Sequence, residues 1–553
     1  MNWFRLPRKQ WQSIGQFLAL FLCCCFLIVS CGGSKTSAPK ANSPSTGASG
    51  NGRITVGITD PPRTLDPADG YEVYVSNIIT SLGDRLYTYK KGTLELEPQL
   101  ATEMPKISQD GLTYTIPLRK GVIFHDGTPF DAKAMEFSLN RFAKNGGKPS
   151  SLLADIVDSI KATGDYELTI KLKNAFAPFP SVLAFSGMCA VSPKAYEIGS
   201  GKFKPNTFVG TGPYKLASFT PQQIRMDVFD KYWGEKPPNK GLDFQIFTNS
   251  SANLYNSFTT GAVDIAYLTL DSSQILNLKS QATSRNWQVV EQTGASLSYM
   301  VLNRNQKPLD KLEVRQAIAS LIDRPLLTQR VYRGQAEPVY SLIPTSFDSY
   351  KAVFKDAYGD GQVEKVKALL TQAGFSKNKP FELEVYYASG AADRAQVVAT
   401  LKEYAAQKLD GIMQIKPQAV DQTTLFSNAQ KGIYQSYLVS WIPDFGDADN
   451  YIQPLLSCVK GSVEKGCEKG ASQSQGSFYY SEQMNKLIDA ERKEKDPQAR
   501  KKIFADIQDL MAKDVPFVPL WLKKDYAFSQ KLIKDVNLNP VLGPTFWEVN
   551  KQA

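Results

Sequence analysis

The sequence predicts an α/β protein with more than one packed lobe, and two observations carry this prediction. The chain has 553 residues, which is enough for two or more lobes rather than a single core. Segments with helical and strand-like periodicity are interleaved along it, which is typical of α/β lobes. The composition, with 42% hydrophobic and 11% aromatic residues, is that of an ordinary globular protein.

Strand-like segments dominate the early part of the chain. Residues 53–58 alternate and then meet Asp60-Pro61-Pro62, which predicts an edge strand that stops there. Residues 112–116 alternate in the same way, residues 131–143 have the spacing of an amphipathic helix, and residues 152–174 return to alternation. Later helical segments cover residues 311–323, 361–373, 391–408 and 480–513, and strand-like segments cover 381–387 and 434–440.

The N-terminus has the pattern of an export signal. Arg5, Arg8 and Lys9 precede an apolar run from Phe17 to Val29, which is shorter than the ~20 residues that a membrane-spanning helix needs. The run ends in Ile28-Val29-Ser30-Cys31-Gly32, which resembles a bacterial lipoprotein box. This resemblance implies that residues 1–30 are a lipoprotein signal peptide, and the alternative is a plain secretory signal cleaved nearby.

Cys31 is the residue that would carry the lipid. Its thiol would take a diacylglycerol and its freed amine a further acyl chain, and several chains on one residue give stable anchoring. The stretch that follows has no large apolar residue up to Gly52, so it cannot bury enough surface to fold. We therefore expect residues 31–52 to be a lipidated cysteine and a flexible tether on the periplasmic side of the cell envelope.

Charge and cysteine content exclude some classes of partner and site. The formal net charge is +10, but no block of consecutive basic residues is long enough to follow a phosphate backbone, so we expect no nucleic acid. Beyond the leader the cysteines are Cys189, Cys458 and Cys467. Cys458 and Cys467 are a disulfide candidate in an oxidising compartment, and Cys189 is expected to be a buried free thiol. A three-cysteine metal site is the alternative, but the spacing fits no zinc pattern.

The sequence contains few of the residues and motifs from which catalytic sites are built. His125 is its one histidine, and its neighbours Asp126-Gly127 predict a hairpin turn in which the ring bonds to local backbone. Gly210-Thr211-Gly212 lacks the third glycine and the lysine of a phosphate loop, so we interpret it as a hinge-like crossing segment. We expect no enzyme, no catalytic residue, no metal and no cofactor.

Short motifs occur in a set order along nearly the whole mature chain. The longest runs from Leu100 to Ala132 and contains Phe124-His125-Asp126-Gly127-Thr128-Pro129-Phe130. The others are Leu65-Asp66-Pro67, residues 209–214, Tyr232-Trp233, residues 261–265, residues 314–318, Ile322-Asp323-Arg324, residues 368–375, the Trp441 to Asp444 segment and Asp514-Val515-Pro516. The series resembles bacterial extracellular solute-binding proteins of family five, the peptide/nickel class of ABC importers, in lipoprotein form.

This resemblance implies a fold and a division of the chain. The fold is the two-lobed α/β periplasmic-binding-protein fold (type II, cluster C), with an extra domain inserted in the first lobe. Lobe I would comprise residues 53–88, 206–292 and 521–553, the insert 89–205, and lobe II 293–520. Ligand would close the interlobe cleft by hinge bending, and the closed monomer would dock on a membrane permease driven by a cytoplasmic ATPase.

The ligand expected from the resemblance is a di- or oligopeptide. In peptide-binding members, the aspartate three residues after the motif tryptophan pairs with the ligand's α-ammonium, and Asp444 stands at that place after Trp441. A buried carboxylate is costly unless a cation meets it. Trp441 would form an apolar wall, and backbone hydrogen bonds would hold the peptide as an added strand.

Alternatives remain at this ligand site. Asp444 would also be explained by capping a turn or by pairing with a fixed lysine or arginine. The nearby Asp447, Asp449 and Asn450 favour turn chemistry over calcium because the EF-hand spacing is absent. Arg304 is a candidate for the peptide's carboxylate. An oligosaccharide, or a metal held by a chelator, is the alternative cargo.

Overall fold

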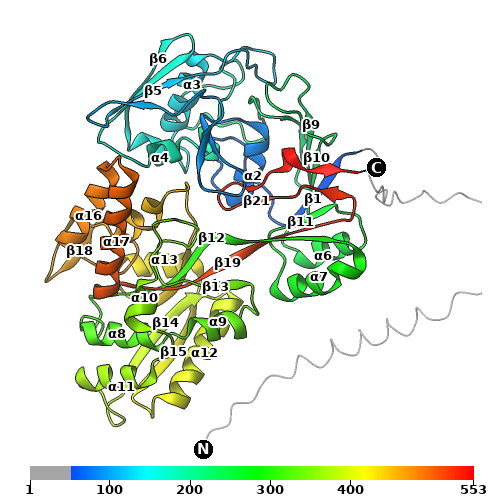
Figure 1. Ribbon diagram of the computed structural model, residues 1–553. Helices are drawn as coiled ribbons and strands as arrows, with labels where there is room; N and C mark the ends of the chain where they lie inside the picture. Colours follow the sequence, from blue (N-terminus) through cyan, green and yellow to red (C-terminus); the bar gives the residue numbers. More distant parts are fainter. Residues whose placement is uncertain (1–51, 553) are drawn as a thin grey trace, which may run out of the picture. The chain divides into compact units, whose positions relative to one another are not determined.

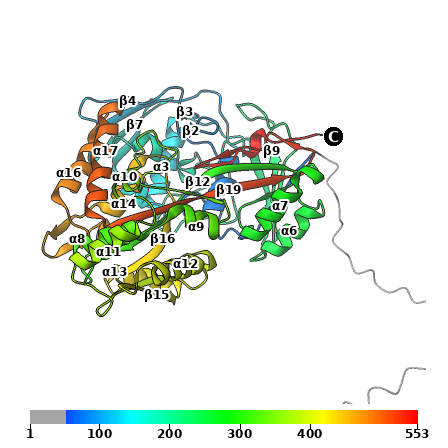
Figure 2. The ribbon, with the colours of Figure 1, turned by 60° about the horizontal axis from the view of Figure 1, so that its bottom comes forward.

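Two long antiparallel strands cross the protein and carry one large sheet. The computed structural model describes residues 52–552, so Cys31 and the predicted signal peptide lie outside the described residues. β12 (Gln288–Leu302) and β19 (Phe517–Ser529) pair from Gln288↔Ser529 to Val301↔Phe517, and both views show them side by side (Figures 1 and 2). They are central in an 11-stranded sheet with the order β15-β14-β16-β12-β19-β11-β1-β10-β9-β8, in which β13 also pairs with β19.

Lobe I surrounds β1 at one end of this sheet. Its strands are β1 (Ile54–Ile58), β8 (Tyr214–Phe219), β9 (Gln223–Val228), β10 (Leu242–Ile246) and β11 (Ile265–Tyr267), and its helices are α2 (Val73–Leu82), α6 (Ser251–Thr259) and α7 (Ser272–Arg285). A C-terminal segment adds β20 (Ile533–Lys534), β21 (Leu538–Asn539), β22 (Gly543–Pro544), η3 (Phe546–Glu548) and β23 (Asn550–Lys551).

The prediction that residues 53–58 form an edge strand is wrong. β1 lies between β10 and β11 and is parallel to both. In the sequence, Thr55 and Gly57 alternate with large apolar residues, and this alternation predicted one face in solvent. Gly57 in fact lies so close to α6 that a Cβ there would be 2.3 Å from Leu254. Both faces of β1 are therefore covered, as is usual for parallel strands.

Residues between β2 and η1 form a separate core around a four-stranded sheet of order β4-β5-β7-β6. Asp131 caps its long helix, because its carboxylate accepts from the Ala134 N–H at 2.8 Å. The elements are β2 (Tyr87–Tyr89), β3 (Leu96–Pro98), β4 (Lys106–Ile107), β5 (Thr113–Pro117), α3 (Ala132–Lys144), α4 (Ser151–Ala154), β6 (Val157–Gly164), β7 (Glu167–Leu172), α5 (Phe179–Val182) and η1 (Ser186–Met188).

Lobe II surrounds β14 at the other end of the large sheet. Its strands are β13 (Ala336–Pro338), β14 (Phe381–Ala388), β15 (Met413–Val420), β16 (Ser436–Trp441), β17 (Lys460–Ser462) and β18 (Gly466–Lys469). Its helices are α8 (Leu312–Leu321), α9 (Arg324–Arg330), α10 (Val353–Tyr358), α11 (Val363–Gln372), α12 (Ala392–Lys408), α13 (Gln422–Gln430), η2 (Ala448–Tyr451), α14 (Gln453–Leu456), α15 (Ala471–Ser474), α16 (Glu482–Lys493) and α17 (Pro497–Asp514). One continuous hydrophobic core joins them.

The single helix predicted for residues 480–513 is two helices. α16 ends at Lys493, and α17 begins at Pro497 after Asp496, whose carboxylate accepts from the Ala499 N–H at 2.8 Å. Proline has no N–H and is favoured at the first position of a helix, so it starts α17 rather than continuing α16. The exact lobe boundaries expected from the sequence stay predictions.

Gly210-Thr211-Gly212 does not cross between the lobes. It lies in the stretch that leads into β8, and the strands that pass between the lobes are β12 and β19. The His125 ring holds this stretch: its Nε2 lies 3.1 Å from the Gly212 carbonyl, and its Nδ1 accepts from the Gly210 N–H at 3.3 Å. The histidine thus bonds to backbone far away in the sequence rather than to its own turn, and burial lowers its pKa to about 4.

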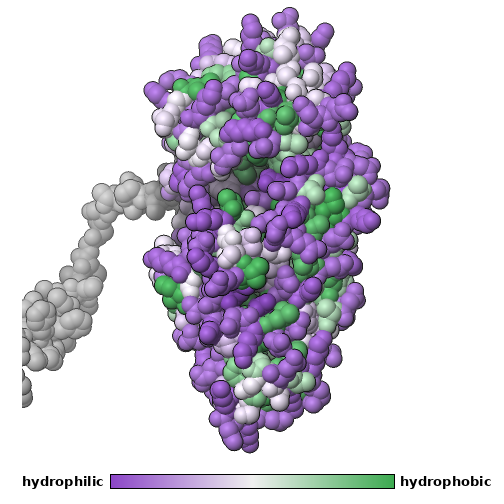
Figure 3. Space-filling model, turned by 90° about the vertical axis from the view of Figure 1, so that its left-hand side faces the viewer, coloured by the Kyte–Doolittle hydropathy of each residue, from purple (hydrophilic) through white to green (hydrophobic). Residues whose placement is uncertain are grey.

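The described residues offer no membrane span. None of their helices combines the length and the apolar character needed to cross a bilayer. On the face drawn in Figure 3, hydrophilic side chains predominate and apolar ones form small separate groups.

Candidate ligand-binding cleft

The loop that follows β16 places Asp444. Asp447 caps η2 by accepting from the Asp449 N–H at 2.8 Å, and Arg500 grips the Asp447 carboxylate with two nitrogens at 2.7 and 2.8 Å. Asn450 then accepts from the backbone N–H of Asp444 at 2.9 Å. A bidentate arginine and a capped turn hold the loop in one geometry. The acidic run is therefore used for turn chemistry, as the sequence indicated.

Asp444 meets no cation among the described residues. Its carboxylate accepts from the Tyr71 hydroxyl at 2.5 Å, and Tyr71 lies just before α2 of lobe I. The aspartate is partly buried, and this burial raises the pKa of its carboxyl group above the ordinary value. Neither capping of a turn by its side chain nor a fixed lysine or arginine accounts for this carboxylate within the part of the chain that the structure describes.

Asp444 and Trp441 line a cavity of about 370 Å³ between the two lobes. Lobe I contributes Tyr71 and residues of α2, and lobe II contributes the end of β16 and its loop. The lining combines apolar walls with few polar groups, which is typical of ligand sites. It comprises Tyr71, Val73, Ser76, Thr80, Ala184, Phe185, Ser186, Ser440, Trp441, Ile442, Pro443, Asp444, Val541 and Leu542.

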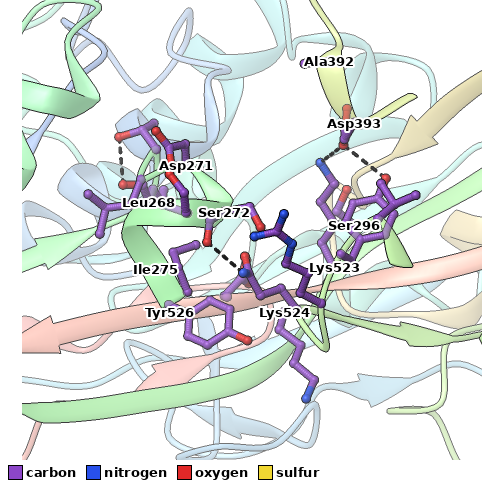
Figure 4. Close-up of a pocket in the computed structure, with 18 of the residues that line it drawn as sticks. Leu268, Asp271, Ser272, Ile275, Ser296, Ala392, Asp393, Lys523, Lys524 and Tyr526 are labelled. Carbon is purple, nitrogen blue, oxygen red and sulfur yellow. Dashed lines mark hydrogen bonds and ion pairs between the residues drawn. The ribbon is translucent and has the colours of Figure 1, made fainter. Parts of the chain in front are cut away.

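A second, larger cavity of about 620 Å³ lies along β19 (Figure 4). Lobe I contributes residues 268–273 and Ile275, and lobe II contributes residues 331–333, Gln335 and the start of α12. Residues 523–526 of β19 complete it. Lys523 is directed towards Asp393 and pairs with it at 2.5 Å (Figure 4).

Arg304 is not placed where a ligand would meet it. The residue lines neither cavity, and its guanidinium donates to the backbone carbonyls of Val463 at 2.8 Å and Tyr480 at 3.4 Å. It braces the hairpin β17–β18, in which Cys458 and Cys467 form a disulfide. In this structure Arg304 tethers a peripheral hairpin, and its role as a carboxylate partner stays an untested prediction.

Arg394 is the arginine that the sequence reasoning missed. It lies in the first turn of α12, is partly buried, and donates from Nη2 to the Ser440 hydroxyl at 3.0 Å. Ser440 in turn lines the cavity of Asp444. Among the described residues, Arg394 takes part in none of the ion pairs within 4.0 Å. The signal in the sequence was its position, at the start of the helix expected at residues 391–408 and just after the strand expected at 381–387.

Metal ligands do not gather in the described part of the chain. No group of three or more histidine, cysteine, aspartate or glutamate side chains there has the arrangement to hold an ion. Cys189 is buried and free, and burial raises the pKa of its thiol to about 12. It is therefore a packed thiol rather than a nucleophile.

Comparison with known proteins places the chain in a family. Residues 95–462 match the model of the bacterial extracellular solute-binding proteins, family 5 (middle region). The chain is 27% identical over 496 residues to a dipeptide-binding protein of Escherichia coli, covering 83% of this chain and 87% of that protein. It is 26% identical to heme-binding protein A of Haemophilus influenzae, covering 84% and 86%, and 25% identical to a glutathione-binding protein of Salmonella paratyphi A, covering 89% and 93%.

Solved structures agree with the fold. HbpA2 from Haemophilus parasuis has a TM-score of 0.77 at 23% identity, covering 91% of this chain and 100% of that one. The ABC transporter-associated periplasmic binding protein DppA from Helicobacter pylori, in complex with the peptide STSA, has a TM-score of 0.72 at 23% identity, covering 91% and 98%. Because the family model spans well over half of the sequence, this chain belongs to family 5 of the bacterial extracellular solute-binding proteins.

Proposed function

We propose that this protein captures di- or oligopeptides in the interlobe cleft and delivers them to the permease of an ABC importer. The observation that carries the proposal is the Asp444 carboxylate, which lines the cleft, is partly buried and has no cationic partner among the described residues. Removing a carboxylate from water is costly unless a cation replaces the water. A peptide's α-ammonium supplies that cation, and a neutral sugar does not.

Arg394 supports the same ligand class from the other end. The Arg394 guanidinium and the Asp444 carboxylate both belong to lobe II. Ser440 connects them, because its hydroxyl accepts from Arg394 and it lines the cavity of Asp444. Arginine is well suited to bidentate recognition of a carboxylate. Arg394 itself lines neither cavity, but through Ser440 it stands beside the cavity of Asp444. A negative group in the cleft with a positive group beside it would suit a zwitterion, which is what a free peptide is.

The relatives favour peptides without excluding other cargo. Two of the three named relatives bind a dipeptide or glutathione, and both of these ligands carry a free ammonium group. The heme-binding relative keeps a chelated metal as the second candidate, and an oligosaccharide remains the third. Neither of these ligands needs a cleft carboxylate that lacks a cationic partner.

The receptor role includes features beyond the cleft. We propose that the protein acts as a monomer without catalytic activity, held by a lipid on Cys31 to the periplasmic side of the envelope. The tether would keep it near its permease and raise the local concentration of loaded receptor. Closure of the lobes around the ligand would then create the surface that the permease recognises.

Mass spectrometry of ligands that co-purify with the protein tests this function. Native spectra of the protein expressed from residue 53 are expected to show bound species that fragment as peptides. Asp444→Asn should release them, while the exposed acid on α12 provides a matched control in Glu403→Gln. Recovery of oligosaccharide or heme with no peptide would overturn the proposal.

A further inference from the structure

The second cavity contains a carboxylate with no partner. Asp525 lies on β19 and lines this cavity. Among the described residues, neither a hydrogen bond nor an ion pair reaches its side chain, and burial alone raises its pKa to about 6. Asp444 likewise has no cationic partner among the described residues, but its carboxylate accepts from the Tyr71 hydroxyl.

Lys523, on the same strand as Asp525, forms an ion pair with a different aspartate. Lys523 and Asp525 are two positions apart and point to the same side of β19. Lys523, however, pairs with Asp393 at 2.5 Å, and the Tyr332 hydroxyl also donates to Asp393 at 3.2 Å. Asp393 therefore neutralises Lys523, and Lys523 does not neutralise Asp525.

The other charged residues of this cavity do not neutralise Asp525 either. Lys524 points its ammonium to Glu291 at 2.7 Å. Asp271 is used as the cap of α7, accepting from the Gln274 N–H at 2.9 Å. Arg333 lies in an exposed turn, where solvent screens its charge.

Strand β12 makes room for the carboxylate. A Cβ added at Gly294 would lie 2.7 Å from Oδ2 of Asp525, so any larger residue there would displace the carboxylate. Aspartate is disfavoured in strands, and glycine weakens them. Gly294 and Asp525, each unfavourable in a strand, thus face each other and together accommodate one desolvated negative charge. Residues that cost stability in this way are expected at functional sites.

The start of α12 contacts residues of both cavities. Residues 390–393 of this segment line the second cavity. Arg394 follows them directly and donates to Ser440, which lines the cavity of Asp444. We infer that a ligand long enough to run from Asp444 past Arg394 would reach the cavity of Asp525.

We propose that Asp525 is a second cation-binding residue of the cleft, which selects ligands with a basic group, such as a lysine or arginine side chain, beyond the N-terminus. The proposal rests on the peptide function argued above and narrows its substrate class to basic oligopeptides. Asp444 would hold the α-ammonium, and Asp525 would hold the side-chain cation. The second cavity provides the space that a dipeptide would not need.

Calorimetric titration of matched peptides tests the proposal. The probes are alanine tetrapeptides with one lysine at position 2, 3 or 4, each compared with the same peptide carrying acetyl-lysine, which has the same stem without the charge. For at least one position, the wild-type protein should bind the lysine peptide about tenfold or more tighter than its acetylated partner. Asp525→Asn should bring that ratio close to one, and the exposed control Glu403→Gln should keep it.

The outcomes separate this inference from the proposed function. If the peptides bind and the ratio is near one at every position in the wild type, Asp525 does not select cations and only the further inference fails. If none of the peptides binds to the wild type, both the inference and the peptide function fail. A ratio that persists in Asp525→Asn would also overturn the inference, because another carboxylate would then supply the selectivity.

Discussion

The hydroxyl group of Tyr71 donates a 2.5 Å hydrogen bond to the carboxylate of Asp444, and the two residues belong to opposite lobes. A hydrogen bond to a charged group contributes roughly 1.5–3 kcal/mol. This bond therefore links the two lobes across the cleft and favours an arrangement that keeps them together. It also gives Asp444 a partner that a ligand ammonium can supplement or replace.

Removing the Tyr71 hydroxyl is expected to open the ligand-free protein. Tyr71→Phe keeps the ring but removes the bond between the lobes, so the closed population should fall about tenfold or more. Small-angle X-ray scattering should record a larger radius of gyration for this variant. Tyr74→Phe is the matched control, because its hydroxyl makes only a 3.4 Å contact with Pro61 within lobe I. Identical scattering for wild type and Tyr71→Phe would show that the bond does not control closure.

Arg394 should matter only for ligands with a free carboxylate. Arg394→Gln retains a donor for Ser440 but removes the positive charge. We expect it to weaken binding of a peptide with a free C-terminus by about tenfold, or 1.4 kcal/mol, and to affect the C-terminally amidated peptide less. Competition fluorescence with both peptides measures the difference. Equal losses for the two peptides would place the carboxylate elsewhere.

The unpartnered carboxylate of Asp525 should reduce stability at high pH. Burial raises its folded-state pKa to about 6 from an ordinary 3.8, so the folded protein binds this proton more tightly than the unfolded chain does. The stability that results is present at about pH 4 and is lost as the pH rises through about 6. The charged residues that share its cavity are Lys523, engaged by Asp393, Lys524, engaged by Glu291, Asp271, which caps α7, and the exposed Arg333. Burial, and after it the charge of Asp525, raises the pKa of the nearby Tyr267.

Asp525→Asn cannot ionise and should therefore melt at a higher temperature than the wild type at about pH 8, with the difference vanishing near pH 4. Differential scanning fluorimetry across this range provides the measurement. A melting temperature that falls in the variant at high pH would mean that a cation within the protein already stabilises the charge.

The disulfide of lobe II should contribute to stability through the unfolded chain. Cys458 and Cys467 are separated by 9 positions, and closing a loop of this size contributes roughly 2–3 kcal/mol in the chain-entropy treatment. The double variant Cys458→Ser/Cys467→Ser should lose about this free energy of unfolding in urea titrations. An unchanged midpoint would show that the hairpin is held by other contacts, of which those of Arg304 are the first candidates.

Individual helices and strands were predictable where a single sequence pattern determined them. The helix expected at residues 391–408 is α12, Ala392–Lys408, because its apolar spacing is uninterrupted. The expected helix at 480–513 failed at Pro497, which local proline chemistry explains after the fact. The position of β1 inside the sheet comes from its parallel pairing with β10 and β11, which are distant in the sequence, and periodicity does not record such pairing.

The site was predictable only in part, for a physical reason. Asp444 and Trp441 could be proposed from the sequence because they belong to one short motif, and both line the same cavity. Tyr71 meets Asp444 across a sequence separation of 373 positions, and Asp525 is distinguished only by the absence of a partner among the described residues. Neither property has a local signature. The carbonyl partners of Arg304 could not be predicted either, because they are set by the fold of a distant hairpin.

The most direct test of the account is a calorimetric comparison of one tetrapeptide with a free N-terminus and its N-acetylated form, using the wild type and Asp444→Ala. If Asp444 receives the α-ammonium, acetylation should cost the wild type roughly 2–5 kcal/mol of binding free energy, and Asp444→Ala should lose a similar amount with the free peptide. The variant should then no longer distinguish the two peptides. Equal affinity of the wild type for the free and the acetylated peptide would contradict the central claim that this cleft recognises a peptide through its ammonium group.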